Sequence, residues 1–172
     1  MTDDSLRDAR PYDAHALADS DLENTSSRSV SASLVVEAPT ARIFELIADP
    51  AEQPRWDGND NLGHADAGQR VHAAGDVFVM HNANGAVREN HVVEFDEGRR
   101  IAWMPAEEGG APIGQVWRWE LVPVDDEHTL VIHSYDWSKL TDEKRLARAR
   151  ATTSDRLLAS IERLAALVEP QE

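Results

Sequence analysis

Five segments rich in Val, Ile, Trp, Tyr and His follow one another between residues 76 and 137, and they constrain the fold more than any other feature of the chain. Short runs of Gly, Asn, Asp or Glu, typical of turns, separate them. Because short connections join antiparallel neighbours, we expect consecutive hairpins of one meandering sheet. The predicted strands are 76–82, 86–96, 99–105, 113–123 and 128–137.

A stripe of apolar residues follows the last of these strands. Its members recur at spacings of three and four residues, which predicts a long amphipathic helix over 141–168. Ser138 or Thr141 is the expected cap at its start. The stripe consists of Leu146, Ala149, Thr153, Leu157, Ile161, Leu164 and Val168.

Another predicted strand, 29–37, precedes the sheet in the sequence. Pro39 suits the first position of a helix, and Pro50 ends that helix after about ten residues, so short helical structure leads to Trp56. The stretch 57–74 is rich in Gly, Asn, Asp and Ala, and no strand is predicted there. The apolar residues that alternate along the first strand are Val30, Ala32, Leu34 and Val36.

Composition excludes several classes of protein. The chain has 172 residues, no cysteine and a formal net charge of -15. The lack of cysteine excludes disulfides, cysteine-bound zinc and iron–sulfur clusters, and the acidic balance argues against nucleic-acid partners. No apolar run approaches the roughly 20 residues that span a bilayer, and the N-terminus lacks the order of a secretion signal. We therefore expect a cytoplasmic protein without stable membrane insertion.

The order of the predicted elements defines a fold class. One strand, two short helices, a run of antiparallel strands and a long terminal helix make an α+β arrangement in one domain, 29–168. Residues 1–28 hold seven acidic residues and three arginines, so we expect an acidic tail, with a second short tail over 169–172. The sheet has to curve around the long helix, and the space between them is the expected site.

Several short motifs resemble the helix-grip fold of the START-related SRPBCC superfamily, in particular its polyketide cyclase/dehydrase families. The likeness spans about 29–168. It implies a curved antiparallel sheet wrapped around the C-terminal helix, with a ligand cavity between them and Trp56 near its mouth. Members bind lipids, hormones, polyketides or quinones, and some are catalysts. The motifs are Ala38-Pro39-Thr40, Asp49-Pro50, Trp56, the run from Val92 to Ile101, Trp119-Glu120-Leu121-Val122-Pro123 and His128-Thr129-Leu130-Val131.

Aromatic side chains crowd the last three predicted strands. Burying an indole is strongly favourable, so most of these rings are expected inside. Trp117 and Trp119 lie two positions apart and are predicted to point inward together. The sequence leaves open whether such rings fill the core or line a cavity. The candidate aromatic ligand contacts are Trp56, Trp103, Trp117 and Trp119.

Within 128–137, His133 and Tyr135 share a face with Val131. The resemblance implies that this face is inward, which would place both polar groups in an apolar chamber. His133 is then a candidate general base or acid, and Tyr135 a candidate hydrogen-bond donor to an oxyanion. The alternative is a surface histidine, or a core histidine paired with a strand neighbour.

His81, Arg88 and His91 are further candidate polar contacts, although alternation allows only one of Arg88 and His91 to face inward. The seven histidines show no compact spacing of metal ligands, so no metal is predicted. No cofactor is predicted either, because nucleotide-binding fingerprints are lacking.

Residues 139–156 carry six cationic and three acidic side chains in an otherwise acidic chain. Cations early in a helix gain nothing from its dipole. One interpretation is attraction of an anionic ligand to the cavity mouth, with Arg148 and Thr152 nearest to it. The other is a solvated helix face that balances acidic neighbours.

Three functions fit these observations. We predict a module that binds a small hydrophobic or aromatic molecule, lipid or polyketide-like, between the sheet and the C-terminal helix. The second is an enzyme of the polyketide cyclase/dehydrase type that promotes aldol cyclisation and dehydration, with His133 as proton shuttle and Tyr135 as donor. The third is a chaperone-associated interaction protein with a filled core. The sequence leaves catalysis, the ligand's identity and the oligomeric state open.

Overall fold

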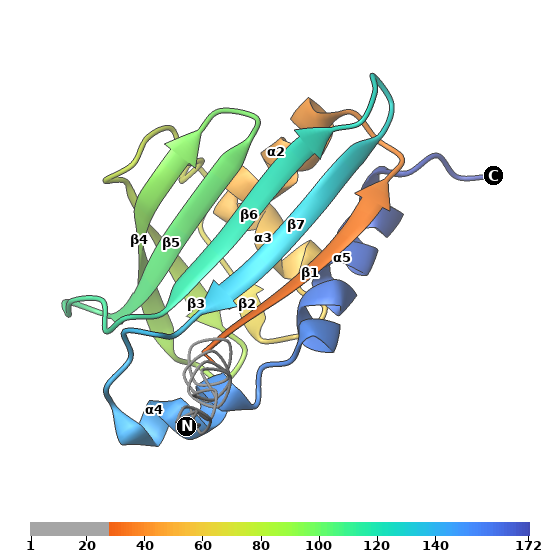
Figure 1. Ribbon diagram of the computed structural model, residues 1–172. Helices are drawn as coiled ribbons and strands as arrows, with labels where there is room; N and C mark the ends of the chain where they lie inside the picture. Colours follow the sequence, from red (N-terminus) through yellow and green to blue (C-terminus); the bar gives the residue numbers. More distant parts are fainter. Residues whose placement is uncertain (1–27) are drawn as a thin grey trace, which may run out of the picture.

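The computed structural model describes residues 28–172, which form one antiparallel sheet and the helices packed against it (Figure 1). The strands lie in the order β1-β7-β6-β5-β4-β3-β2. The predicted acidic tail, apart from Arg28, lies outside the described residues. The strands are β1 Ser29–Val36, β2 Leu62–His64, β3 Val77–Asn82, β4 Val87–Asp96, β5 Arg100–Glu107, β6 Val116–Pro123 and β7 Thr129–Asp136.

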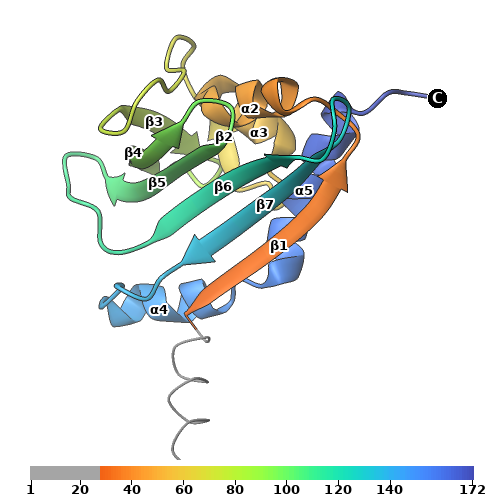
Figure 2. The ribbon, with the colours of Figure 1, turned by 45° about the horizontal axis from the view of Figure 1, so that its top comes forward.

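The helices cover one face and one end of this sheet. Figure 2 shows α2, α3 and α5 on the same side of the sheet, with α4 near the end of β7. A bent antiparallel sheet around a C-terminal helix is the predicted α+β architecture. The helical elements are α2 Thr40–Ala48, the 3-10 turn η1 Pro50–Glu52, α3 Gln53–Trp56, α4 Glu143–Arg150 and α5 Ser154–Val168.

The predicted meander is confirmed. Strands β3 to β7 pair consecutively, and β1 extends the sheet by pairing with β7. The additional strand, β2, lies in the stretch 57–74, where the sequence predicts none. It has only three residues and its register shifts against β3, so it is too short to show alternation.

Alternation along β6 and β7 decides which side chains face the helices. His133 and Tyr135 of β7 are buried, and the residues that alternate with them along the strand are half-exposed. Trp119 and Leu121 of the neighbouring β6 are buried as well. The inward faces predicted for these two strands are confirmed.

Strand β4 changes face within its length because a β-bulge lies between Val92 and Glu94. Strict alternation predicts that Arg88 and Phe95 lie on opposite faces. The bulge reverses the alternation, so Phe95 also packs against the core, with its ring centroid 5.8 Å from that of Phe44. Both ends of β4 therefore contribute inward side chains.

The single helix predicted over 141–168 is wrong in one respect: it is two helices, α4 and α5. Thr153, the residue before α5, has extended backbone angles, φ -105° and ψ 163°. Leu146 and Ala149 of α4 pack in a cluster around Trp137, whereas most buried residues of α5 belong to the main core. One periodic pattern thus covers two helices that pack in different places.

The start of α4 also differs from the prediction, because neither Ser138 nor Thr141 caps it. Asp142 is the capping residue, and its carboxylate accepts a hydrogen bond from the backbone N–H of Lys144 at 3.0 Å. An acidic cap satisfies a free N–H and interacts favourably with the helix dipole, so the shift of one residue strengthens the cap.

Helix α2 is short because the chain turns back and completes its end. The Trp56 indole donates a hydrogen bond to the carbonyl of Leu46 at 2.7 Å, and the Gln53 amide donates to that of Ile47 at 3.1 Å. The last carbonyls of a helix have no partner within it, so these side chains satisfy them. Trp56 is thereby fixed with its ring centroid 5.0 Å from that of Trp119.

Gly58 brings the chain after Trp56 into close contact with α5. A Cβ atom at this position would lie 2.4 Å from the carbonyl carbon of Ala159 and 2.5 Å from the nitrogen of Ser160. The Gly58 N–H donates to the Ser160 hydroxyl at 3.0 Å. The segment 56–58 therefore touches the sheet and α5 together.

The variant Gly58→Ala is expected to lower the free energy of unfolding by about 3 kcal/mol, because the loop or α5 has to move to admit the methyl group. The melting temperature measured by circular dichroism should fall by about 6–12 °C. Gly110→Ala is the matched control, since its Cβ would lie 3.2 Å from the nearest atom in an exposed turn. An unchanged melting temperature for Gly58→Ala would contradict this account.

Candidate functional site

A cavity of about 340 Å³ lies between the inner face of the sheet and the segments that cover it. This volume is at the lower end of the range for small-molecule sites, about 300–1,000 Å³. Strands β3 to β7 form one wall, and α3, the loop after it, α4 and α5 form the others. The space between sheet and helices is therefore open.

Four tryptophans line the apolar part of the cavity. They are Trp56 from α3, Trp103 from β5, and Trp117 and Trp119 from β6. Trp103 lies opposite Trp117 in the sheet, and Trp119 stacks on His133 with ring centroids 3.8 Å apart and planes 11° apart. All four predicted aromatic contacts thus line the cavity, three from the sheet and Trp56 from α3, where it also completes the end of α2.

His133 is 4% exposed and lines the cavity as a neutral imidazole. Its Nδ1 atom lies 3.0 Å from the carbonyl oxygen of Arg118, so the proton is on Nδ1 and the lone pair is on Nε2. Among the residues that the structure describes, Nε2 has no partner. Burial lowers the pKa of His133 from 6.5 to about 4, and the bond to Arg118 opposes that shift. The ring offers a ligand a hydrogen-bond acceptor.

Tyr135 is not part of the cavity wall. Its ring stacks on Trp117, with centroids 4.0 Å apart, and its hydroxyl accepts a hydrogen bond from the Gln115 amide at 2.8 Å. Burial raises the pKa of Tyr135, against the smaller opposing effects of Gln115 and the Arg148 charge. Gln115 does line the cavity, so Tyr135 is connected to the cavity only through its hydrogen bond with Gln115.

Three further predicted contacts do not reach the cavity. His81 alternates with the lining residues of β3 and stacks on His64, with centroids 4.5 Å apart. His91 follows the inward-facing Asn90 and lies on the other face. Thr152 lies in the turn between α4 and α5. The structure therefore separates these three side chains from the aromatic wall.

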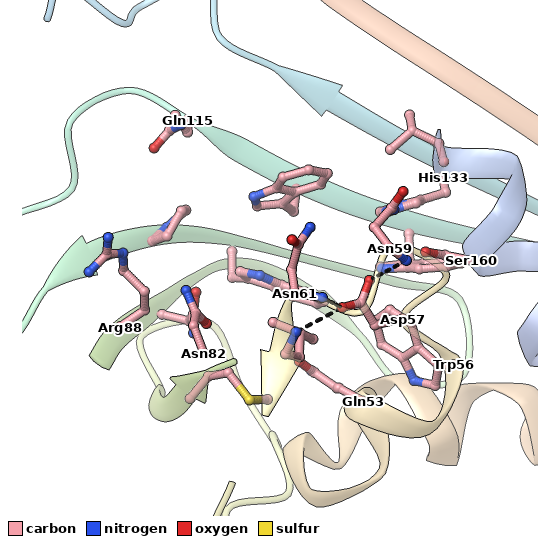
Figure 3. Close-up of a pocket in the computed structure, with 18 of the residues that line it drawn as sticks. Gln53, Trp56, Asp57, Asn59, Asn61, Asn82, Arg88, Gln115, His133 and Ser160 are labelled. Atoms are coloured by element: carbon pink, nitrogen blue, oxygen red, sulfur yellow. Dashed lines mark hydrogen bonds between the residues drawn. The ribbon is translucent and has the colours of Figure 1, made fainter. Parts of the chain in front are cut away.

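A polar rim completes the cavity. Arg88 and Arg148, both predicted, line it together with Arg145. Figure 3 shows Arg88, Asn82 and Gln115 toward one end, and Trp56, His133 and Ser160 toward the other. The cavity is therefore more polar than the hydrophobic chamber expected from the sequence. The amide side chains of its lining are Gln53, Asn59, Asn61, Asn82, Asn90 and Gln115.

Asn90 is the most informative residue that the sequence analysis missed. It is only 6% exposed, on the same face as Arg88, and its side chain has no hydrogen-bond partner within residues 28–172. Buried amides normally have hydrogen-bond partners, so a partner for the Asn90 amide is expected to lie in the cavity. An asparagine within a strand of high β-propensity was the available signal, because asparagine is depleted in strands.

Asp57 holds the loop that follows α3. Its carboxylate accepts hydrogen bonds from the backbone N–H groups of Asn59, Asn61 and Leu62 at 3.1, 2.7 and 2.8 Å, two of which are drawn in Figure 3. Arg163 of α5 donates to the Asp57 carbonyl at 2.6 Å. These bonds fix the loop and place the Asn59 and Asn61 side chains in the cavity wall.

Within residues 28–172, no group of three or more histidine or acidic side chains is placed to hold a metal ion. None of the helices in that range is long and apolar enough to cross a membrane. The chemistry of the cavity is that of indole faces, amides, a neutral imidazole and guanidinium groups.

A curved antiparallel sheet that closes on a C-terminal helix around a cavity defines a helix-grip protein, as the sequence resemblance predicts. The chain belongs to the family described as polyketide cyclase / dehydrase and lipid transport, whose model matches residues 27–169. A comparison with curated proteins finds no match.

Solved structures share this fold at low sequence identity. The Aha1 dimer from Colwellia psychrerythraea is 17% identical with a TM-score of 0.56, over 82% of this chain and 96% of that chain. A norcoclaurine synthase point mutant from Thalictrum flavum, in complex with a transition state analogue, is 12% identical with a TM-score of 0.57, over 81% and 92%. Major latex-like protein 151 from Panax ginseng is 17% identical with a TM-score of 0.57, over 83% and 97%. These identities establish the fold alone.

The lowered pKa of His133 predicts a specific dependence of stability on pH. The unfolded chain takes up a proton near pH 6.5, whereas the folded chain does so only near pH 4, so acidification through this window favours unfolding. Between about pH 7 and about pH 5 the free energy of unfolding should fall by about 2 kcal/mol from this group. In urea titrations over this pH range, the free energy of unfolding of His133→Gln should fall by correspondingly less than that of the parent protein. Identical pH profiles for the two proteins would show that His133 is not buried as a neutral ring.

Proposed function

We propose that this protein binds a small aromatic or otherwise hydrophobic molecule, of lipid or polyketide-like chemistry, in the cavity between the sheet and the C-terminal helix. The observation that carries the proposal is an open chamber whose walls combine indole faces with polar groups that lack partners in the described part of the chain. Sites for small molecules are built this way, with few polar groups on largely apolar walls.

The two ends of the cavity support this proposal together. Trp103, Trp117 and Trp119 present indole surface to the cavity, so an aromatic or conjugated body gains from burial against them. Asn90 and the Nε2 atom of His133 offer hydrogen bonds that nothing in the described chain uses. Both groups are accessible from the cavity, so a ligand with complementary groups can pair them and gain orientation.

A polyketide cyclase has less support. Ring closure by aldol chemistry and loss of water needs a group that takes and returns protons, and such groups work best with a pKa near the operating pH. The pKa of His133, about 4, makes it a weak base and leaves no proton on Nε2 to donate at neutral pH. Tyr135, the other candidate, is outside the cavity wall.

A chaperone-associated interaction protein would act through its outer surface and would need no cavity. The likeness to Aha1 is one of fold, so it adds no support for that role. Polar groups that line the cavity and have no partner within residues 28–172 favour an internal ligand instead.

The variant Asn90→Phe is expected to weaken binding of 2-naphthaleneacetamide, a neutral aromatic probe, by at least about tenfold in isothermal titration calorimetry. The added ring occupies cavity volume, and the substitution removes no hydrogen bond within the described chain. Native mass spectrometry of the purified parent protein is expected to show a small molecule that is released on denaturation.

Val77→Phe is the matched control, because Val77 is 48% exposed and does not line the cavity. It should bind the probe as the parent does. A parent protein that carries no small molecule and gives no heat of binding with the probe would contradict the proposed function.

A further inference from the structure

We propose that the molecule bound in the cavity is a carboxylate, whose apolar or aromatic body lies along the tryptophan wall and whose acid group lies between Arg88 and Arg148. This inference rests on the proposed binding function and adds the chemical class of the ligand. Its basis is the charge of the cavity and the order in which its side chains occur along the strands.

The charge of the cavity is opposite to that of the chain. The formal net charge is -15, yet the lining holds three arginines and one aspartate. The aspartate, Asp57, accepts hydrogen bonds from three backbone N–H groups and serves the loop after α3. Positive charge is therefore concentrated at the cavity of a strongly acidic protein, and such a field favours an anion.

The three arginines differ in the ion pairs that they form within the described residues. Arg145 pairs with Glu107 and, at 3.7 Å, with Asp142. Within residues 28–172, neither Arg88 nor Arg148 forms an ion pair. A guanidinium carries five N–H donors in a planar fork that matches a carboxylate, so both are suited to bind one.

Arg88 is held in place but keeps most of its donors. One Nη1 donor reaches the backbone carbonyl of Val87 at 3.1 Å, and the side chain is half-buried on the face of β4 that also carries Asn90. Glu107 lies opposite Arg88 in the sheet, but this carboxylate is paired with Arg145. The acid that would otherwise neutralise Arg88 is thus already engaged.

Arg148 approaches the same end of the cavity from α4. The ion pair between Arg145 and Glu107 ties α4 to the strand end that lies beside Arg88. Arg148 is close enough to Tyr135 for its charge to oppose the rise that burial causes in the pKa of that phenol. Tyr135 is hydrogen-bonded to Gln115, so the Arg148 guanidinium, whose charge acts on Tyr135, lies on the Gln115 side of the cavity.

On the sheet side of the cavity, the lining side chains change from aromatic to polar and charged along the strands. Trp119 and His133 are paired neighbours at one end, and Trp103 and Trp117 form the next row. Asn90 follows, opposite the lining residue Pro105, and Arg88 lies two residues nearer the end of the sheet. Figure 3 shows this separation, with Arg88 far from His133. A molecule with an apolar body and one terminal acid matches this order.

The test compares two probes with the same ring system, 2-naphthaleneacetate and its neutral amide, by isothermal titration calorimetry near neutral pH. The parent protein is expected to bind the acid at least about tenfold more tightly than the amide. Arg88→Gln and Arg148→Gln should each weaken binding of the acid about tenfold and weaken binding of the amide much less, because only the acid loses a charge-assisted hydrogen bond. Arg88→Lys, which keeps the charge, should recover part of the affinity for the acid.

Arg150→Gln is the matched control, because Arg150 lies on the same helix, is exposed and does not line the cavity. Equal affinities for acid and amide in the parent would overturn the carboxylate proposal and leave the binding function standing. Binding of neither probe would overturn both. If Arg150→Gln weakened binding of the acid as much as Arg88→Gln and Arg148→Gln, or if the latter two weakened both probes equally, these two arginines would not hold the acid group.

Discussion

The contact on which the rest of the molecule depends is made by Trp56 and Gly58. The Trp56 ring meets Trp119 on the sheet while its N–H completes the end of α2, and two residues later the backbone of Gly58 lies against α5 with no room for a Cβ atom. Sheet, α2 and α5 are thereby held at a fixed spacing from one end. Beyond that contact the next rings along the sheet are tryptophans that stand between the layers. The cavity lies where these rings line the space between the sheet and the helices.

Periodicity predicts those helices and strands that keep the same face toward the core along their whole length. Strand β7 and the run of hairpins follow this rule, and so does the choice of face that buries His133. The rule fails where an element serves two environments. The bulge in β4 lets Arg88 and Phe95 share a face, and the break at Thr153 lets one apolar stripe pack against two clusters. Neither the bulge nor the helix break alters the amino-acid composition of its segment, so the spacing of apolar residues does not indicate either one.

The candidate site was predictable in its aromatic half for the same reason. An indole is expected inside wherever it occurs, so Trp103, Trp117 and Trp119 are predicted inside the fold, although the sequence leaves open whether they fill the core or line a cavity. Amides and arginines are usually exposed, and the sequence does not tell which of them a curved sheet turns inward. Alternation leaves open whether Arg88 or His91 faces inward. The buried Asn90, which shares a face with Arg88, shows which face of β4 lines the cavity. The loop after α3, where Asp57 organises backbone N–H groups, has no periodic signal at all.

Apolar burial and charge have different roles in such a cavity. The field of an acidic chain repels an approaching anion, but salt screens it over a Debye length of about 8 Å at physiological ionic strength. In the proposed complex the acid would meet the half-buried guanidinium of Arg88 and the exposed guanidinium of Arg148 at contact, where a charged hydrogen bond outweighs several distant charges. The indole faces give comparable affinity to any ring of suitable size, because burial is nondirectional. In the proposed complex, selection among such rings would therefore come from the polar end, where Asn90, Arg88 and Arg148 would discriminate between ligands that the tryptophans accept alike.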